Sequence, residues 1–177
     1  MVVAAAGAWT DQLAETAGVP PVGLTPLRRT IAIAVGPQPV DPAWPLVADT
    51  AETFYFRPES GALLVSPADE TPSEPGDAKP DDLDVALALD RVNDVTALGL
   101  RTVRTAWAGL RTFAPDRGPV VGAREGHPGF AFFAGQGGYG IQMAPALAVA
   151  GAAVITGEEP PADLGVTAAR LSPDRFA

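Results

Sequence analysis

A glycine-rich turn between two apolar runs constrains the fold of this chain more than any other stretch. Four glycines fall within six residues: Gly135, Gly137, Gly138 and Gly140. An apolar run over residues 130–133 precedes them and another over residues 143–155 follows, an order that predicts a strand, a turn and a helix. Glycine adopts positive φ and lets a ligand approach the backbone. Because the helix would place unpaired N–H groups and a positive dipole end beside the turn, we predict a site for a flat, electron-rich or anionic group.

The spacing of Gly135, Gly137 and Gly140 also matches the dinucleotide-binding pattern G-x-G-x-x-G. That pattern needs a second strand after the helix, with an acidic residue at its end. Here the expected helix ends near Gly157, and the polar tail that follows contains no apolar run. We therefore rank an independent NAD-binding enzyme low, and interpret the turn as a site for another cofactor or ligand, or as a purely structural turn.

Composition and charge exclude several classes of function. The chain has 177 residues, 47% of them hydrophobic, which is enough for a globular core. Its formal net charge of −9 would repel nucleic acid and anionic membranes. There is no cysteine, and the one histidine, His127, is expected in an exposed turn without a role, so we expect no metal site. With no secretory signal and no run of about 20 apolar residues, we expect a cytoplasmic protein.

The two ends of the chain carry elements typical of a parallel sheet. Residues 2–6 form an apolar run without alternation, which predicts a buried parallel strand whose neighbours lie outside this chain. The segment 8–17 predicts a helix with Trp9, Leu13 and Ala17 on one face, ending at Gly18.

The sequence pattern in the middle of the chain is typical of an antiparallel sheet with a helix. Residues 27–35 alternate and predict a strand with one apolar side, formed by Leu27, Arg29, Ile31, Ile33 and Val35. Residues 53–57 and 62–65 predict a hairpin, residues 66–82 an exposed loop, and residues 101–111 a further strand. A helix is expected from a cap at Asp81 or Asp82 to Val95, with inward residues Leu83, Ala86, Leu87 and Val92.

These elements predict an α/β fold with an α+β insertion. Residues 1–22 and 113–177 would belong to one parallel sheet, and residues 23–112 would form an inserted antiparallel domain with helices.

Arginines in apolar strands are the candidate ligand-binding residues. A guanidinium on an apolar sheet face needs a partner, and a carboxylate matches its planar fork. For Arg111, which ends a strand among apolar groups, binding of a ligand and pairing with an internal carboxylate are equally open. For Arg28, which precedes Arg29, and for Arg57, which follows an aromatic run over residues 54–56, pairing with an internal carboxylate is favoured. No general base is visible, and a redox cofactor would explain its absence.

Several motifs together resemble a known family. They are the segments 2–9, 27–30, 54–58, 107–111, 135–142 and 171–173, in this order. The chain resembles the C-terminal half of the FAD-dependent D-amino acid oxidase/dehydrogenase (DAO) family, and within it the D-arginine dehydrogenases most. The string Gln-Gly-Gly-Tyr-Gly-Ile-Gln at residues 136–142 is the most specific part of this resemblance.

The resemblance implies a cofactor, a reaction and site residues. FAD would accept hydride from the α-carbon of a D-amino acid, and the imine would hydrolyse to a 2-oxo acid. Residues 1–22 and 113–177 would then belong to the FAD-binding domain and residues 23–112 to the substrate-binding domain. Tyr55 would be catalytic, and the substrate would contact Arg29, Tyr55, Arg111, Gly138 and Tyr139. The cofactor would contact Ala6, Gly7, Gln136, Gly137, Gly138, Tyr139, Gly140, Ile141 and Gln142.

Two departures from the family pattern matter. Ala4 stands where the family usually has Asn, and the family's N-terminal FAD fingerprint does not occur in this sequence. We therefore expect a truncated product, a fragment or one part of a split enzyme, which binds FAD poorly by itself. The alternative is a non-catalytic binding or interaction module that needs an N-terminal partner. The apolar first strand predicts self-association or such a partner.

Overall fold

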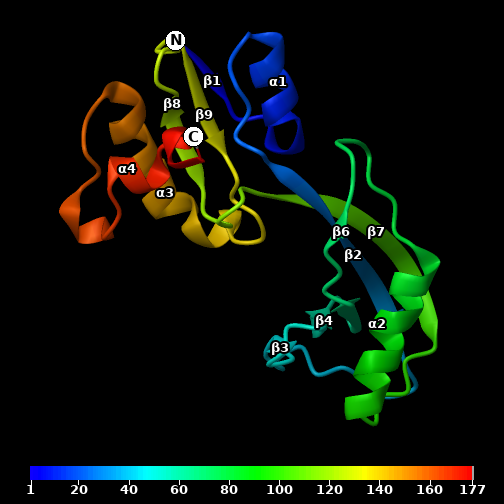
Figure 1. The fold of residues 1–177 in the computed structure, drawn as a ribbon. Coiled ribbons are helices and arrows are strands. Elements are labelled where there is room, and N and C mark those ends of the chain that lie inside the picture. Colours follow the sequence, from blue (N-terminus) through cyan, green and yellow to red (C-terminus); the bar gives the residue numbers. More distant parts are fainter. Residues whose placement is uncertain (177) are drawn as a thin grey trace. The chain divides into compact units, whose positions relative to one another are not determined.

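The computed structural model describes residues 1–176, and the chain divides into two compact units. The terminal unit combines Met1–Pro26 with the chain from Arg111 onward, and the central unit is Leu27–Leu110. Figure 1 labels most of the helices and strands of both units. The assignment of FAD binding to residues 1–22 and 113–177, and of substrate binding to residues 23–112, stays a prediction.

The terminal unit contains a three-stranded sheet in the order β1-β9-β8. Strand β1 (Val2–Ala4) pairs in parallel with β9 (Phe130–Ala134), which confirms the parallel pairing expected at the start of the chain. The prediction that this first strand is buried is wrong, because Val2 is 58% and Val3 44% exposed. Among the described residues β1 pairs only with β9, so its other edge lacks a neighbour. Strand β8 (Val120–Ala123) is antiparallel to β9 and was not predicted, because four residues ending at a turn carry too little periodicity.

Helix α1 (Thr10–Thr16), preceded by the 3-10 turn η1 (Gly7–Trp9), packs on one face of this sheet. Ala14 is fully buried in the same core as Phe130 and Phe132. The predicted apolar face is wrong, since Trp9 is 47% and Leu13 41% exposed. Small side chains face the sheet because they allow the helix to approach it closely.

Helix α3 (Gly140–Thr156) follows the glycine turn as predicted and ends at Gly157, which has a φ of 86°. It packs beside β8, where Leu147 and Ala150 share a core with Val121. The polar tail that follows forms η2 (Ala162–Leu164), α4 (Ala168–Leu171) and η3 (Pro173–Phe176), none of which was predicted. Leu171, at 2% exposure, joins the α3 core. Within the described residues no strand follows α3, so the second strand of a dinucleotide-binding unit does not occur there.

The central unit is built on a six-stranded sheet in the order β3-β4-β5-β2-β6, with β7 also paired to β2. Its strands are β2 (Thr25–Val35), β3 (Val47–Ala48), β4 (Tyr55–Glu59), β5 (Ala62–Ser66), β6 (Thr71–Pro72) and β7 (Thr102–Phe113). The predicted hairpin is confirmed by β4 and β5, whose turn contains Ser60 and Gly61 at positive φ. Strands β2 and β7 are also the segments through which the chain leaves and re-enters the terminal unit.

The buried face of β2 is the opposite of the one predicted. Ala32 pairs with Val65 and Ala34 with Leu63, and all four are buried in the core under α2 (Asp82–Val95). The predicted apolar side lies on the other face, where Ile31, Ile33 and Val35 are half-buried, while Leu27 and Arg29 are buried. The alanines were misjudged because their small side chains carry little hydrophobic signal, although they let a helix pack closely.

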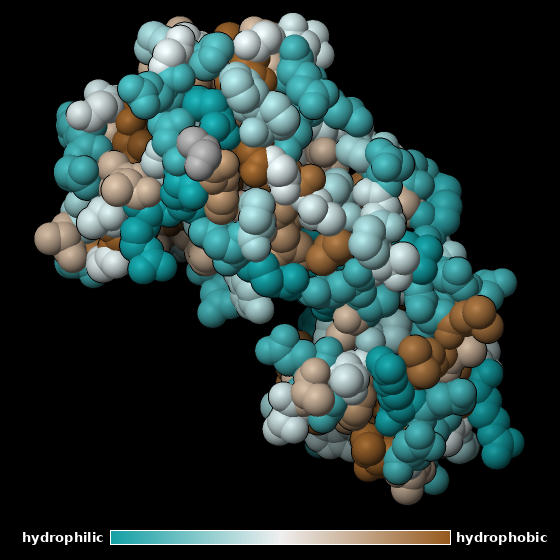
Figure 2. Space-filling view, in the orientation of Figure 1, coloured by the Kyte–Doolittle hydropathy of each residue, from teal (hydrophilic) through white to brown (hydrophobic). Residues whose placement is uncertain are grey.

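Helix α2 confirms its predicted cap and end, but of the four residues predicted to face inward only Val92 is buried. The Asp81 carboxylate accepts a hydrogen bond from the Leu83 N–H at 2.9 Å, and the helix ends at Val95. Leu83 is 79% exposed, and the core side has the spacing i, i+3, i+4, i+7, formed by Val85, Ala88, Leu89 and Val92. Figure 2 shows hydrophobic residues scattered among hydrophilic ones on the visible surface.

Candidate functional site

The glycine turn begins directly after β9 and is fastened to the end of β7. Gly135 and Gly137 adopt φ values of 75° and 54°, as a glycine turn requires. The Gly137 N–H donates to the Thr112 carbonyl oxygen at 2.9 Å, and Gln136 forms a bridge with Phe113. The turn is therefore held from both sides, by β9 and by the last residues of β7.

Two of the glycines leave room for side chains of β7. A Cβ on Gly137 would overlap the Phe113 ring, and a Cβ on Gly138 would lie 2.8 Å from Arg111 Nη1. The Arg117 guanidinium stacks on the same Phe113 ring, with its Cζ 3.9 Å from the ring centroid. Two of the predicted cofactor-binding positions thus have a packing reason to be glycine, which the sequence pattern alone could not reveal.

The start of α3 carries no side-chain cap. Tyr139 occupies the N-cap position without making a capping hydrogen bond, and the first turn contains no acidic residue. Tyr139 is 49% and Ile141 is 96% exposed. A helix of 17 residues with an uncapped N-terminus and apolar groups beside it suits a flat group that carries partial negative charge.

The predicted residues at the start of the chain lie at the same sheet edge as the glycine turn. Strands β1 and β9 are parallel, with Ala4 opposite Phe132, so the segments after their carboxyl ends leave the same edge. These segments are Ala6–Gly7 and the glycine turn. Gly7 has a φ of 54°, and a Cβ there would meet no atom within 4 Å. Ligands of open α/β sheets bind at this edge, outside the carboxyl ends of the strands.

In the central unit, strand register places Tyr55 and Arg29 on the same face of the sheet. Phe56 pairs with Val65 and is buried towards α2, so Tyr55 lies on the opposite face. Since Ala32 and Ala34 of β2 also face α2, alternation places Arg29 opposite as well. The structure therefore brings two of the predicted substrate contacts to one surface.

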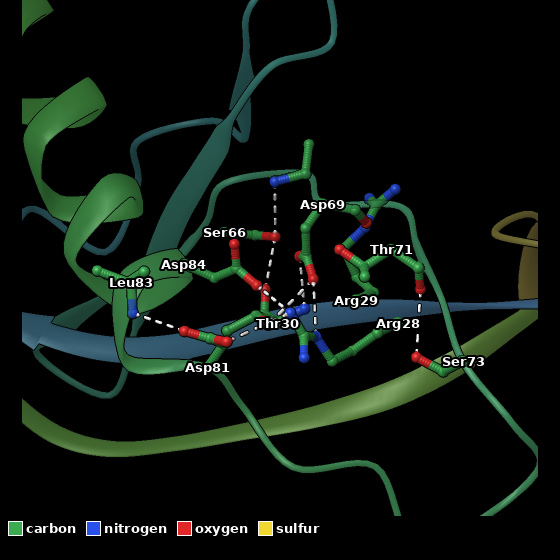
Figure 3. Close-up of polar contacts among 11 residues, drawn as sticks. Arg28, Arg29, Thr30, Ser66, Asp69, Thr71, Ser73, Asp81, Leu83 and Asp84 are labelled. Carbon is green, nitrogen blue, oxygen red and sulfur yellow. Dashed lines mark hydrogen bonds and ion pairs between the residues drawn. The ribbon is translucent and has the colours of Figure 1, made fainter.

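Arg29 is 8% exposed, and it is bonded to the segment that follows β5. Its Nε donates to the Asp69 carbonyl oxygen at 2.8 Å, and its Nη2 donates to Glu70 Oε1 at 3.3 Å. Figure 3 shows Arg29 and Asp69 among the neighbouring polar residues. The prediction that residues 66–82 form an exposed loop is wrong here, since Ser66 is fully buried and β6 pairs with β2. No pattern in this Pro- and Asp-rich stretch signals that one of its aspartates is buried.

The Asp69 carboxylate joins this segment to β2. It accepts hydrogen bonds from the Thr30 N–H at 2.7 Å and from the Thr30 hydroxyl at 3.1 Å. Arg28 Nε lies 3.6 Å from the same carboxylate, and Arg28 Nη2 lies 2.6 Å from Asp84. The predicted internal pairing is thus confirmed for Arg28, and also for Arg57, which pairs with Glu59 at 2.6 Å.

The turns around His127 lie at the opposite end of β9 from the glycine turn. His127 is half-buried between the turns that join β8 to β9. Among the described residues, no three His, Asp or Glu side chains lie close enough together to hold a metal ion.

A comparison with known families decides the affiliation. The family model described as FAD dependent oxidoreductase (DAO) matches residues 1–153. The chain belongs to the DAO family. This DAO chain is 34% identical over 163 residues to FAD-dependent oxidoreductase domain-containing protein 1 of Bos taurus. The match covers 83% of this chain and 34% of the bovine protein, so the chain spans about a third of that relative's length.

Solved structures confirm the predicted fold class for this DAO chain. L-proline dehydrogenase from P. horikoshii superposes with a TM-score of 0.78 at 23% identity, covering 99% of this chain and 46% of that one. Glycine oxidase from Geobacillus kaustophilus gives a TM-score of 0.70 at 24% identity, covering 89% and 42%. None of the helices that the structure describes is both long and apolar enough to cross a membrane.

The residues at the carboxyl edge of the parallel strands fit the FAD that the family requires. The uncapped α3 N-terminus offers N–H donors to an electron-rich ring edge, and open space borders Gly7. Exposed Tyr139 and Ile141 supply apolar surface for a flat ring. The chemistry of the donors and the space both suit the ring end of a flavin.

Proposed function

We propose that this chain is the portion of an FAD-dependent oxidoreductase that binds an amino acid carboxylate and the ring end of the flavin. The reaction would oxidise the α-amine of a D-amino acid to an imine, which water converts to a 2-oxo acid. The observation that carries the proposal is the position of Arg111 against Gly138, two residues before the uncapped start of α3. A guanidinium and a helix N-terminus together favour a carboxylate and an electron-rich ring at one place.

FAD, when bound, supplies the oxidising power, because it accepts the two electrons and two hydrogens that the amine loses. The chain's own residues would bind and orient the flavin ring and the substrate. Residues 137–142 would border the flavin ring, and the N–H groups at the start of α3 would stabilise negative charge there. Tyr139 and Ile141 would exclude water from this edge.

The resemblance of the motifs also assigns substrate contacts to Tyr55 and Arg29. The Tyr55 hydroxyl would donate a hydrogen bond to the carboxylate, and Arg29 on the same sheet face would add positive charge. Two donors of Arg29 already go to Asp69 and Glu70, so we propose that its charge matters more than a new bidentate contact. An amino acid substrate agrees with the names of the solved neighbours, which are a glycine oxidase and an L-proline dehydrogenase. The D configuration rests on the resemblance of the motifs.

The role of Arg111 predicts a selective loss of carboxylate binding. We expect the purified chain with excess FAD to bind D-arginine in a calorimetric titration, and to bind D-argininamide, which lacks the carboxylate, far more weakly. Arg111→Ala should weaken D-arginine binding by roughly tenfold or more, because a charge-assisted hydrogen bond contributes about 1.5–3 kcal/mol.

Arg57→Ala is the matched control for this titration. Arg57 pairs with Glu59, and its side chain is 47% exposed, so its loss should leave D-arginine binding unchanged. Equal binding by wild type and Arg111→Ala would contradict the proposed role of Arg111. Absence of any D-arginine binding by wild type would contradict the proposal for this chain.

One alternative keeps the same ligands without turnover. Because the matched region is 34% of the bovine relative, this chain would then be a ligand-binding portion that needs a complementary polypeptide for activity. Dye reduction driven by D-arginine separates the two versions. Turnover by the chain with FAD supports the enzyme, and saturable binding without turnover supports the ligand-binding portion.

A further inference from the structure

The side chain of Arg111 lies on a surface made by Gly138. A Cβ built on Gly138 would stand 2.8 Å from Arg111 Nη1, 3.3 Å from its Cζ and 3.4 Å from its Cδ. All three nearest atoms therefore belong to one arginine side chain, which follows the glycine backbone from its Cδ to its guanidinium. Both residues belong to the terminal unit.

The backbone at Gly138 does not explain why glycine occupies the position. Gly135 and Gly137 have positive φ, but Gly138 does not, so its φ does not require glycine. Gly138 is also exposed, so no buried core around it would be overfilled by a methyl group. What a side chain would disturb is the place of Arg111.

The turn is rigid enough for this contact to fix a position. On the N-terminal side, Gly137 donates to the Thr112 carbonyl oxygen at 2.9 Å, and its missing side chain makes room for the Phe113 ring. On the C-terminal side, the Tyr139 N–H donates to the Gln136 carbonyl oxygen at 3.1 Å. The turn and the end of β7 thus form one assembly, in which Gly138 faces the guanidinium.

We propose that Gly138 is a positioning residue, which sets where the Arg111 guanidinium meets the substrate carboxylate. This inference rests on the proposed role of Arg111 in binding the carboxylate. A methyl group at residue 138 would force the guanidinium to move away, because real Cβ atoms do not approach other atoms as closely as 2.8 Å. Binding groups work only within about 0.5 Å of their productive geometry, and a shift of about 1 Å can cost up to 100-fold.

The test compares D-arginine binding, in the presence of FAD, by wild type, Gly138→Ala, Arg111→Ala and Gly129→Ala. We expect Gly138→Ala to bind roughly tenfold more weakly than wild type. Gly129→Ala should bind like wild type, because a Cβ at Gly129 meets no atom within 4 Å and its φ is not positive. If Arg111→Ala binds like wild type, the proposed function fails. If Arg111→Ala loses binding while Gly138→Ala keeps it, only the present inference is overturned.

A second measurement separates positioning from damage to the turn. Lysine at residue 111 lacks the Nη1 and Cζ atoms that a Cβ would approach, so Gly138→Ala should cause little further loss in an Arg111→Lys background. An equal loss in both backgrounds would mean that the substitution harms the turn itself, and would overturn the inference. The Arg111 Nε–Hε resonance, assigned by its absence in Arg111→Lys, should also shift in Gly138→Ala and stay in place in Gly129→Ala.

Discussion

At the scale of single residues, Asp69 shows how a buried carboxylate can organise a region that composition marks as a loop. Its carboxylate accepts two hydrogen bonds from Thr30, and its carbonyl oxygen accepts one from Arg29 (Figure 3). It also lies 3.6 Å from Arg28 Nε. One residue therefore connects β2 to the segment after β5 through both its side chain and its backbone.

Removing this carboxylate should destabilise the protein. Asp69→Ala leaves the Thr30 N–H without its acceptor and removes an anion near Arg28, so we expect a loss of about 1–3 kcal/mol in the free energy of unfolding. Urea denaturation measures it. Asp77→Ala is the control, because the Asp77 side chain is 86% exposed and pairs with the exposed Lys79. A loss no larger than that of Asp77→Ala would show that Asp69 does not organise this region.

At the scale of elements, the C-terminal tail is fastened by Arg175 of η3. Arg175 Nε donates to Asp116 Oδ2 at 2.9 Å, and its two Nη atoms donate to the carbonyl oxygens of Leu171, Ser172, Gly118 and Pro119. The hydrogen bond from Arg175 holds the pKa of the Asp116 carboxyl below its ordinary value of 3.8. The polar C-terminal tail is thus hydrogen-bonded to the turn before β8.

This contact predicts a pH dependence of stability. A carboxyl with a lowered folded pKa stabilises the fold above its unfolded pKa, and the contribution disappears as the pH falls through the folded value. We expect Asp116→Asn to lower the melting temperature at pH 7, and the difference from wild type to vanish below the folded pKa of Asp116. The effect should be small, because Asp116 is 49% exposed and solvent screens the pair.

Thermal unfolding between pH 2 and 7 measures this dependence, with Asp163→Asn as the control. Asp163 is exposed and lies in the same tail, so its substitution should leave the melting temperature unchanged throughout. A difference between Asp116→Asn and wild type that stays constant down to the lowest pH would contradict the role assigned to the ion pair.

At the scale of the whole molecule, sequence reasoning succeeded where a signal is local. The strand, turn and helix around Gly135–Gly140, the cap at Asp81 and the hairpin turn at Ser60–Gly61 each follow from short-range backbone preferences. The inward face predicted for β2 was wrong, and that predicted for α2 was right only at Val92. Burial depends on which partner an alanine meets, whereas large side chains such as Leu83 weigh more in a hydrophobic pattern.

In the candidate site, too, local features could be predicted from the sequence and long-range contacts could not. Glycine spacing indicated the turn, but only the three-dimensional structure shows that Gly137 and Gly138 make room for Phe113 and Arg111. Likewise, no sequence pattern indicates that Asp69 and Glu70 hold Arg29, since the contacts span about forty residues of chain. A single sequence does not indicate which residues far apart in the chain contact each other.

The central claim is that the start of α3 faces a flavin, and FAD affinity of wild type and Ile141→Glu tests it most directly. Ile141 is 96% exposed, and an acidic residue in the first turn of a helix favours helix stability, so the variant should melt no lower than wild type. If the flavin ring lies there, the carboxylate will repel its electron-rich edge, and FAD should bind several-fold more weakly in a fluorescence titration. Because wild type is expected to bind FAD weakly, the titration must extend to high FAD concentrations. Equal FAD affinity of the two proteins would contradict the account.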